Sequence, residues 1–323
     1  MKISILLPYK ENFSSSYAGA VSLLLNDTTK LSKFYNNIKI YGSTNFKKDL
    51  LSKKYINLPI RKFFFQSSTK IYLKKFITKE ISNPSKIIEI HNRPNYLNEI
   101  FKINPNIVLY FHNDPLHQKG SILKKERIDL LKKTRKIIFI SNWVKNRFFS
   151  DIKHLKKTTS NYIVIPHSIN KVKIDINKKK NLIIFVGRLN SSKGYDIFGK
   201  AILEILTKHN DWKAIVYGDE PREKITFKHK NLKILGFKKH KEILNKLKLS
   251  NISVVCSRWE EPFGRTALES SSRACATIIS NRGGLPETTD HCIILKKLSS
   301  NELYLNLKKL IKNQKFRKKI QQD

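Results

Sequence analysis

Two glutamates, Glu261 and Glu269, flank a Pro-Phe-Gly segment, and their spacing suggests a ligand site. On one continuous helix, with a rise of about 1.5 Å per residue, they would lie roughly 12 Å apart, too far to share a small ligand. Pro262 argues against that arrangement, because a residue before proline is disfavoured in the helical region. We therefore expect Glu261 in a loop, followed by a helix that begins near Phe263 or Gly264 and carries Glu269 about two turns in.

The chemistry predicted for this segment is anion binding. Residues 251–256 have the pattern of a short buried strand, so the unit is a strand, a loop with a carboxylate and then a helix. The open amino end of a helix offers free N–H groups to a phosphate, and Gly264 removes the side chain that would keep a ligand away. A surface loop before a helix with ordinary acidic residues would look the same, so both interpretations stay open on this segment alone.

A second segment, residues 185–194, places two cations after a predicted strand. The strand ends at Gly187, and Arg188 and Lys193 follow before the next predicted helix. The arginine fork matches phosphate oxygens and lysine adds a compact charge, so the pair can neutralise a diphosphate without a metal. The chain contains no Asp-x-Asp through which a metal could bridge a diphosphate, and we expect no metal ion here.

Polar residues also follow two predicted strands of the first half. His91 and His112 each open a polar tetrad closed by proline, and the second tetrad includes Asp114. Parallel sheets bind ligands beyond the carboxyl ends of their strands, so the two histidines are expected to converge on one rim. Gly19, near the first predicted helix, would let a ligand approach the backbone closely. A strand-end histidine can equally be a satisfied structural residue, so a site and a structural role both remain open.

The elements that must position these residues alternate between short β-rich runs and longer helical stretches, which is typical of parallel sheets with helical crossovers. This predicts an α/β protein of two doubly wound domains, residues 1–170 and 171–323, with the linker near 166–180. The predicted strands are 2–7, 38–41, 86–90, 107–111, 137–140, 163–165, 182–186, 213–217, 232–235, 252–256, 277–279 and 293–295.

Composition narrows the classes of protein. A chain of 323 residues with 40% hydrophobic residues suits two globular domains. The three cysteines show no metal-ligand spacing and argue against a disulfide framework, and the apolar runs are too short to span a membrane. The amino terminus lacks the pattern of a secretory signal. We expect a cytoplasmic protein.

The formal net charge of +39 suggests polyanionic partners, either nucleic acid or an anionic membrane surface. The lysines are scattered in twos and threes rather than gathered in one block with aromatic residues. A biased lysine-rich composition explains this distribution without any partner. We expect weak attraction to the inner face of an anionic membrane and no nucleic-acid binding.

Other nucleotide-binding motifs are absent or incomplete. No Gly-x-Gly-x-x-Gly follows a predicted strand. The segment 194–201 has the glycine and lysine spacing of a P-loop, but Ala201 stands where a metal-binding hydroxyl is required and the segment runs into an apolar helical stretch. A nucleoside triphosphatase is therefore disfavoured.

Together these residues resemble the retaining glycosyltransferases of the GT-B fold, in the large family-four group. The matching pieces are 187–194, 261–269 and 283–287, with weaker matches at 141–144 and 165–170. The likeness spans most of the chain and is more specific in the second half. It implies two Rossmann-like domains facing a cleft, with the nucleotide-sugar donor held mainly by the second and the acceptor by the first.

The resemblance implies roles for the second-half motifs. Arg188 and Lys193 would hold the donor diphosphate and stabilise the charge that develops on it as the glycosidic bond breaks. Glu269 would accept hydrogen bonds from the ribose hydroxyls, and Glu261 would contact hydroxyls of the donor sugar. The segment between the two glutamates would present backbone amides to the donor, from Phe263 and Gly264.

For the first half the resemblance implies less. His91 matches the position that reaches toward the donor sugar, and Gly19 lies in the loop that approaches the diphosphate. His112 and Asp114 would lie on the acceptor side. The family's chain usually ends in a helix that returns to the first domain, and no such return is evident before Asp323.

The expected activity is metal-independent, retaining transfer of a hexose to a glycan or lipid-linked acceptor, in cell-envelope polysaccharide or lipopolysaccharide assembly, with no cofactor beyond the nucleotide sugar. Two alternatives stay open. One is a basic nucleic-acid or membrane-binding protein on a degenerate GT-B fold, and the other is a nucleotide-sugar epimerase.

Overall fold

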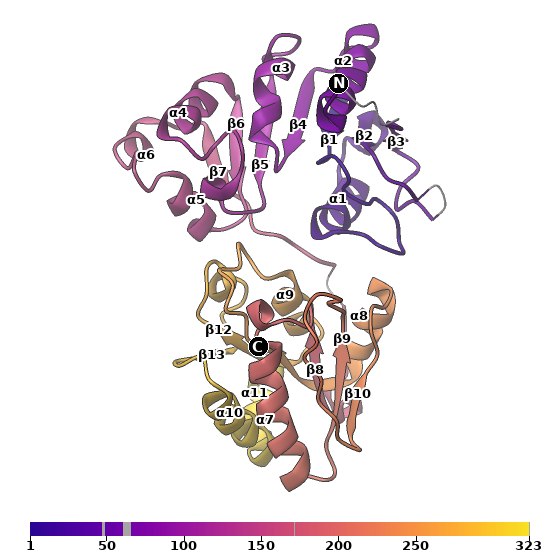
Figure 1. The fold of residues 1–323 in the computed structure, drawn as a ribbon, viewed down its shortest axis with the longest axis vertical. Coiled ribbons are helices and arrows are strands. Elements are labelled where there is room, and N and C mark those ends of the chain that lie inside the picture. The colour runs from indigo at the N-terminus through magenta and orange to yellow at the C-terminus, as the bar shows by residue number, and fades with distance from the viewer. Residues whose placement is uncertain (47–48, 61–65, 171, 323) are drawn as a thin grey trace. The chain divides into compact units, whose positions relative to one another are not determined.

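The protein consists of two compact units (Figure 1), Met1–Ser168 and Ile169–Asp323. The computed structural model describes residues 1–46, 49–60, 66–170 and 172–322. The boundary between the units lies between residues 168 and 169, whereas the sequence suggested a boundary between residues 170 and 171.

The first unit is built on a seven-stranded sheet in which every pairing of neighbouring strands is parallel. The strand order is β3-β2-β1-β4-β5-β6-β7, which contains the order of a Rossmann sheet. The strands are β1 (Ile3–Leu6), β2 (Ile38–Gly42), β3 (Tyr55–Asn57), β4 (Ile87–His91), β5 (Ile107–Phe111), β6 (Lys136–Phe139) and β7 (Tyr162–Val164). The helices are α1 (Ala20–Leu31), α2 (Ser68–Ser82), α3 (Leu97–Phe101), α4 (Lys124–Lys133), α5 (Asn142–Phe148) and α6 (Leu155–Thr158).

The second unit repeats the plan with a six-stranded parallel sheet of order β10-β9-β8-β11-β12-β13. Its strands are β8 (Lys180–Val186), β9 (Lys213–Tyr217), β10 (Leu232–Ile234), β11 (Ser250–Val255), β12 (Ala276–Ser280) and β13 (Ile293–Leu295). Its helices are α7 (Tyr195–Lys208), α8 (His240–Leu249), α9 (Arg265–Ser271), α10 (Ser300–Lys312) and α11 (Gln314–Gln322).

Alternation along β8 explains why helices cover both faces of this sheet. Ile183 and Phe185 belong to one apolar cluster with residues of α7 and α10, whereas Ile184 belongs to another with Leu247 of α8. Successive residues of a strand point to opposite faces, so a continuous apolar run requires cover on each side. The predicted class of two Rossmann-like, doubly wound parallel-sheet domains is confirmed.

Each of the twelve predicted runs forms a strand, with ends that agree to within two residues. Two details of the prediction were wrong. The short strand β3 was missed, and α9 begins at Arg265, so Glu269 lies little more than one turn into the helix rather than two. The reason is Gly264, whose φ of 133° lies outside the helical region and delays the first helical residue.

The last described helix, α11, packs within the second unit, where the Gln321 amide donates to the carbonyl oxygens of Asn251 and Ala274. Among the described residues, no helix combines the length and apolarity needed to cross a membrane.

Candidate functional site

The strand order places the switch point of the second sheet between β8 and β11, and ligands of open parallel sheets bind beyond the carboxyl ends of such strands. The loops after these two strands are held tightly together. Arg258 and Trp259 donate their backbone N–H groups to the carbonyl oxygen of Ser192, at 2.9 and 3.0 Å. Gly194 has a φ of 71°, and a Cβ there would lie 1.9 Å from the carbonyl oxygen of Cys256. Only glycine permits this approach.

This loop contact brings together Lys193 and Glu261, which are 68 residues apart in sequence. The Lys193 Nζ lies 2.5 Å from the Glu261 Oε1, which also accepts a 2.6 Å hydrogen bond from the Ser257 hydroxyl. The lysine side chain is 29% exposed and the glutamate side chain 14% exposed. The ion pair is therefore within reach of solvent and of a ligand.

Arg188 lies just beyond the end of β8 and is exposed. Within the described part of the chain its guanidinium has no hydrogen-bond or ion-pair partner. A cation held on a short strand-end loop without an internal partner is free to bind an external anion, and arginine suits phosphate oxygens best.

Glu269 lies deeper, with only 7% of its side chain exposed. Its Oε1 accepts hydrogen bonds from the His240 Nε2 and the Arg265 Nε, both at 2.8 Å. Burial alone would raise the pKa of Glu269, but the hydrogen bonds and charges of His240 and Arg265 outweigh burial and lower that pKa. The carboxylate is therefore ionised near neutral pH.

The sequence did not single out His240. It is the first residue of α8, in the connection that follows β10. The rule that strand-end connections carry function could have found it, because the segment after this predicted strand contains a histidine.

Phe263 and Gly264 connect Glu261 to α9. The Phe263 residue is 4% exposed, and a Cβ on Gly264 would lie 2.3 Å from a methyl carbon of Leu285. The glycine pair that follows β12 fixes the other side of the loop, since the Gly284 N–H donates to the Glu261 carbonyl oxygen at 2.6 Å. The segments 261–264 and 283–285 thus form one packed unit that fixes the Glu261 backbone.

In the first unit, His91, the last residue of β4, and His112, which follows β5, do converge. The His91 Nδ1 lies 2.9 Å from the His112 Nε2, and the His112 Nδ1 lies 3.1 Å from the Nε2 of His167, a third histidine that sequence reasoning did not select. The residues are 0%, 5% and 8% exposed. These side chains are therefore largely buried within the first unit.

We call His91, His112 and His167 the histidine chain, and its central residue, His112, is neutral. Burial lowers the pKa of His112, and the neighbouring His91 and His167 lower it further. Asn92 links the same loops, because its Oδ1 accepts the backbone N–H groups of His112 and Asn113 at 2.9 and 3.1 Å.

Asp114 and Gly19 also contact other residues of the first unit. The Asp114 carboxylate accepts from the Leu116 N–H at 3.0 Å and from the Arg147 Nε at 2.9 Å, so it caps a short turn and holds an arginine. A Cβ on Gly19 would lie 2.2 Å from the Glu11 Oε1. The space that Gly19 leaves open is therefore occupied by this carboxylate rather than by open solvent.

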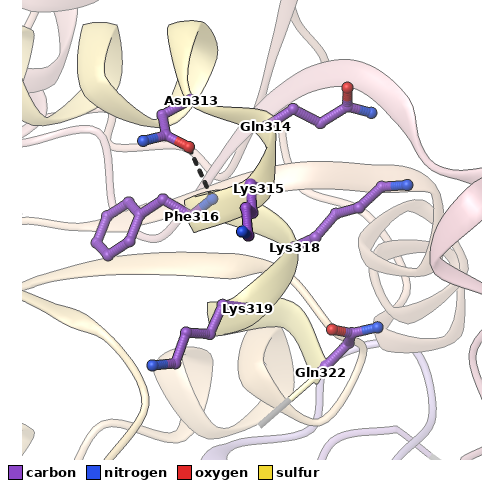
Figure 2. Close-up of a pocket in the computed structure, with 7 residues that line it drawn as sticks. All are labelled: Asn313, Gln314, Lys315, Phe316, Lys318, Lys319 and Gln322. Carbon is purple, nitrogen blue, oxygen red and sulfur yellow. Dashed lines mark hydrogen bonds between the residues drawn. The ribbon is translucent and has the colours of Figure 1, made fainter.

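Two surface hollows lie apart from these residues. One of about 730 Å³ is lined by α11, and Figure 2 shows the side chains of Lys315, Lys318 and Lys319 around it. Another of about 980 Å³, between β3 and α2, is lined by several lysines. Neither is lined by Arg188 or by the residues that surround the two glutamates. Within the described ranges, no three His, Cys, Asp or Glu side chains gather as a metal site would require.

The second unit matches a known protein family. Residues 167–323 match the family described as glycosyl transferases group 1. The putative glycosyltransferase YtcC of Bacillus subtilis (strain 168) is 22% identical over 90% of this chain and 77% of its own length. Spore coat protein SA of the same organism is 31% identical, but the match covers 34% of this chain and only 33% of that protein.

The fold is shared over nearly the whole chain. The crystal structure of Anabaena Alr3699/HepE in complex with UDP superimposes with a TM-score of 0.75 at 17% identity, over 99% of this chain and 93% of that one. The same protein in complex with UDP-glucose gives a TM-score of 0.72. The second unit therefore matches the glycosyl transferases group 1, and the two parallel-sheet domains of the chain are those of the GT-B fold.

Proposed function

We propose that this protein is a metal-independent, retaining hexosyltransferase that moves a sugar from a nucleotide-sugar donor to a glycan or lipid-linked acceptor. The observation that carries the proposal is the partly exposed Lys193–Glu261 ion pair, with Arg188 in the same loop as Lys193 and without a partner among the described residues. The complexes of HepE with UDP and UDP-glucose, a protein of the same fold, support a nucleotide sugar as donor.

In this mechanism the donor diphosphate replaces Glu261 as the partner of Lys193. Phosphate oxygens take hydrogen bonds from Lys193 and Arg188, and Glu261 is released to accept hydroxyls of the donor sugar. Fixed cations stabilise the negative charge that grows on the leaving diphosphate as the bond from the anomeric carbon to oxygen breaks. Glu269, ionised and nearly buried, accepts hydrogen bonds from the ribose.

Transfer then forms one bond between the acceptor oxygen and the anomeric carbon. The acceptor proton passes to an oxygen of the departing diphosphate, so no other base is needed. Attack on the same face that the diphosphate leaves retains the anomeric configuration. Retention is the part of the proposal that rests on the family resemblance.

The acceptor is assigned to the first unit because the donor-binding residues lie in the second. His91, His112 and Asp114 support the strand-end loops there through the contacts described above. Peripheral contact with the cytoplasmic face of an anionic membrane fits the excess of 64 lysines and arginines over 25 acidic residues. The name of spore coat protein SA places that relative in a cell-surface structure, and a cell-envelope product fits this context.

Calorimetric titration with UDP-glucose and a panel of other nucleotide sugars tests donor binding. Lys193→Ala is expected to lower the transfer rate about 10²- to 10³-fold, the usual cost of removing one donor that stabilises transition-state charge. Lys200→Ala is the matched control, because Lys200 is an exposed lysine of α7 and belongs to the segment that resembles a P-loop. If Lys193→Ala and Glu269→Ala both bind nucleotide sugars as the unaltered protein does, the site is misassigned.

A basic polyanion-binding protein is the second candidate, and the lysine-lined hollow beside α2 favours it. Single-stranded RNA would then bind with an affinity that falls steeply with salt, while nucleotide sugars would not bind. An epimerase would convert the donor without an acceptor, so a product that requires an acceptor separates it from a transferase.

A further inference from the structure

Glu269 is held by residues from two different helices. Arg265 precedes it by one turn on α9, whereas His240 is the first residue of α8 and lies 29 residues away in sequence. The His240 side chain is 25% exposed and the Glu269 side chain 7% exposed. This cluster, His240, Glu269 and Arg265, lies wholly within the second unit.

The carboxylate also offsets a charge at a helix start. Arg265 occupies the first position of α9, where the helix dipole disfavours positive charge. Glu269, one turn along the same helix, compensates that charge. Glu269 in turn stays ionised in spite of its burial, because His240 and Arg265 stabilise its negative charge.

The geometry constrains one oxygen and leaves the other available. Both hydrogen bonds end on the Glu269 Oε1, and the Oε2 accepts none from the described residues. Arg265 is on the same helix as Glu269 and moves with it. His240 is the contact that links the carboxylate to another element, so it sets the direction in which the Oε2 points relative to the sheet.

We propose that His240 is a positioning residue for donor recognition, which holds the Glu269 Oε1 so that the Oε2 is presented to a ribose hydroxyl. This inference rests on the proposed function, in which Glu269 binds the ribose of the donor. It adds a residue that no sequence motif of the chain contains, and it predicts coupling between His240 and a hydroxyl of the ligand.

The test is a mutant cycle between protein and ligand. Calorimetry measures the affinity of the full chain for UDP, 2′-deoxy-UDP and 3′-deoxy-UDP, with the ADP and GDP series where UDP does not bind. The unaltered protein is expected to prefer the ribonucleotide about tenfold over one deoxy form, the value of one hydrogen bond to a charged group. His240→Ala is expected to weaken ribonucleotide binding about tenfold and deoxynucleotide binding hardly at all, so the preference disappears.

Two conservative variants separate positioning from folding. His240→Gln retains a side-chain N–H at a similar reach and should restore the preference, whereas the shorter His240→Asn should not. His229→Ala is the control, because the His229 ring accepts a hydrogen bond only from the nearby Asn231 N–H in its own loop among the described residues. It should leave the preference unchanged.

The possible outcomes separate the role of His240 from the proposed function on which it rests. Absence of nucleotide binding by the unaltered protein overturns the proposed function. A ribose preference that persists in full in His240→Ala and His240→Asn overturns the role of His240 while the function stands. Equal loss of affinity for ribo- and deoxynucleotides in both variants also overturns it, because that pattern reports a general structural effect.

Discussion

In the first unit the histidines at or just after the ends of β4, β5 and β7 are buried and hydrogen-bonded to one another. In the second unit, charged residues that follow β8 and β11 stay partly exposed. His91, with no exposed surface, and Lys193, with 29% of its side chain exposed, represent the two cases. Both sets lie where parallel sheets bind ligands. Position alone therefore does not distinguish a ligand site from a structural network.

The difference lies in what the side chains already contact. In the histidine chain, both ring nitrogens of His112 already have internal partners. Burial and the two neighbouring histidines lower the pKa of His112, so its ring is neutral. In the second unit the Lys193–Glu261 pair can exchange one partner for a phosphate, and Arg188 is exposed. Substitutions in the first unit should therefore change stability most, and those in the second should change activity most.

The largest effect on stability is expected from His112→Ala. The change removes a buried ring and leaves nitrogen atoms of His91 and His167 without its hydrogen bonds. We expect a loss of about 3 kcal/mol in the free energy of unfolding, from the lost packing and the unsatisfied polar atoms. Hydrogen exchange followed by mass spectrometry measures this in the full chain, because it reports β4 and β5 separately from the second unit.

Lys193→Ala is the counterpart in the second unit. Its ion pair is partly exposed, so the loss of stability should stay below about 1 kcal/mol while transfer activity is lost. Equal protection of β4 and β5 in His112→Ala and in the unaltered protein would contradict the structural role of the histidine chain.

A smaller effect is expected from pH. The folded pKa of His112 is lowered, so the unfolded chain binds a proton at a pH where the folded chain does not. Stability from this group is complete above the unfolded pKa of about 6.5 and falls as the pH drops below it, by at most about 1.4 kcal/mol per pH unit. Exchange protection of β4 and β5 at pH 6.5 and 5.5, corrected for intrinsic rates, checks the sign, and His112→Ala should flatten the response.

Glu269 responds in a different range. Its folded pKa lies below the usual value of 4.5, so the stability it contributes is present above that pH and is lost only as the pH falls further. Between pH 6.5 and 5.5, Glu269 should therefore contribute no loss of protection around α9. A parallel loss of protection in the strands around the histidine chain and in α9 over this range would remove the contrast between these two sites.

The sequence predicted the sheets well because their strands are continuous apolar runs that need cover on both faces. In β8 the run from Leu182 to Phe185 has this pattern, whereas β3 has only three residues, with Tyr55 its one buried member, and gave no signal. The start of α9 was displaced because the positive φ of Gly264 depends on packing against Leu285, which lies far away in the chain.

The candidate site was predicted in its members but not in its contacts. Motif residues such as Lys193 and Glu261 could be selected from strand ends and from the family pattern. Their pairing could not, because it depends on the close approach of Gly194 to the end of β11. His167 was missed because it lies in a segment without apolar periodicity. His240 was missed because it begins an amphipathic helix without a recognised motif. Each gains its role from a partner on another element.

The smallest effect is expected from an exposed ion pair that resembles the Lys193–Glu261 pair in chemistry alone. The Lys102 Nζ lies 3.0 Å from the Glu99 Oε2, and the two side chains are 68% and 52% exposed. Lys102→Ala should change the free energy of unfolding by less than about 0.5 kcal/mol, because water competes for both charges, and it should leave transfer unchanged. Exchange protection of α3 and a transfer assay measure the two quantities. A loss as large as that of His112→Ala would mean that burial does not explain why the two units respond differently, whereas a loss of transfer would extend the charged site beyond the second unit.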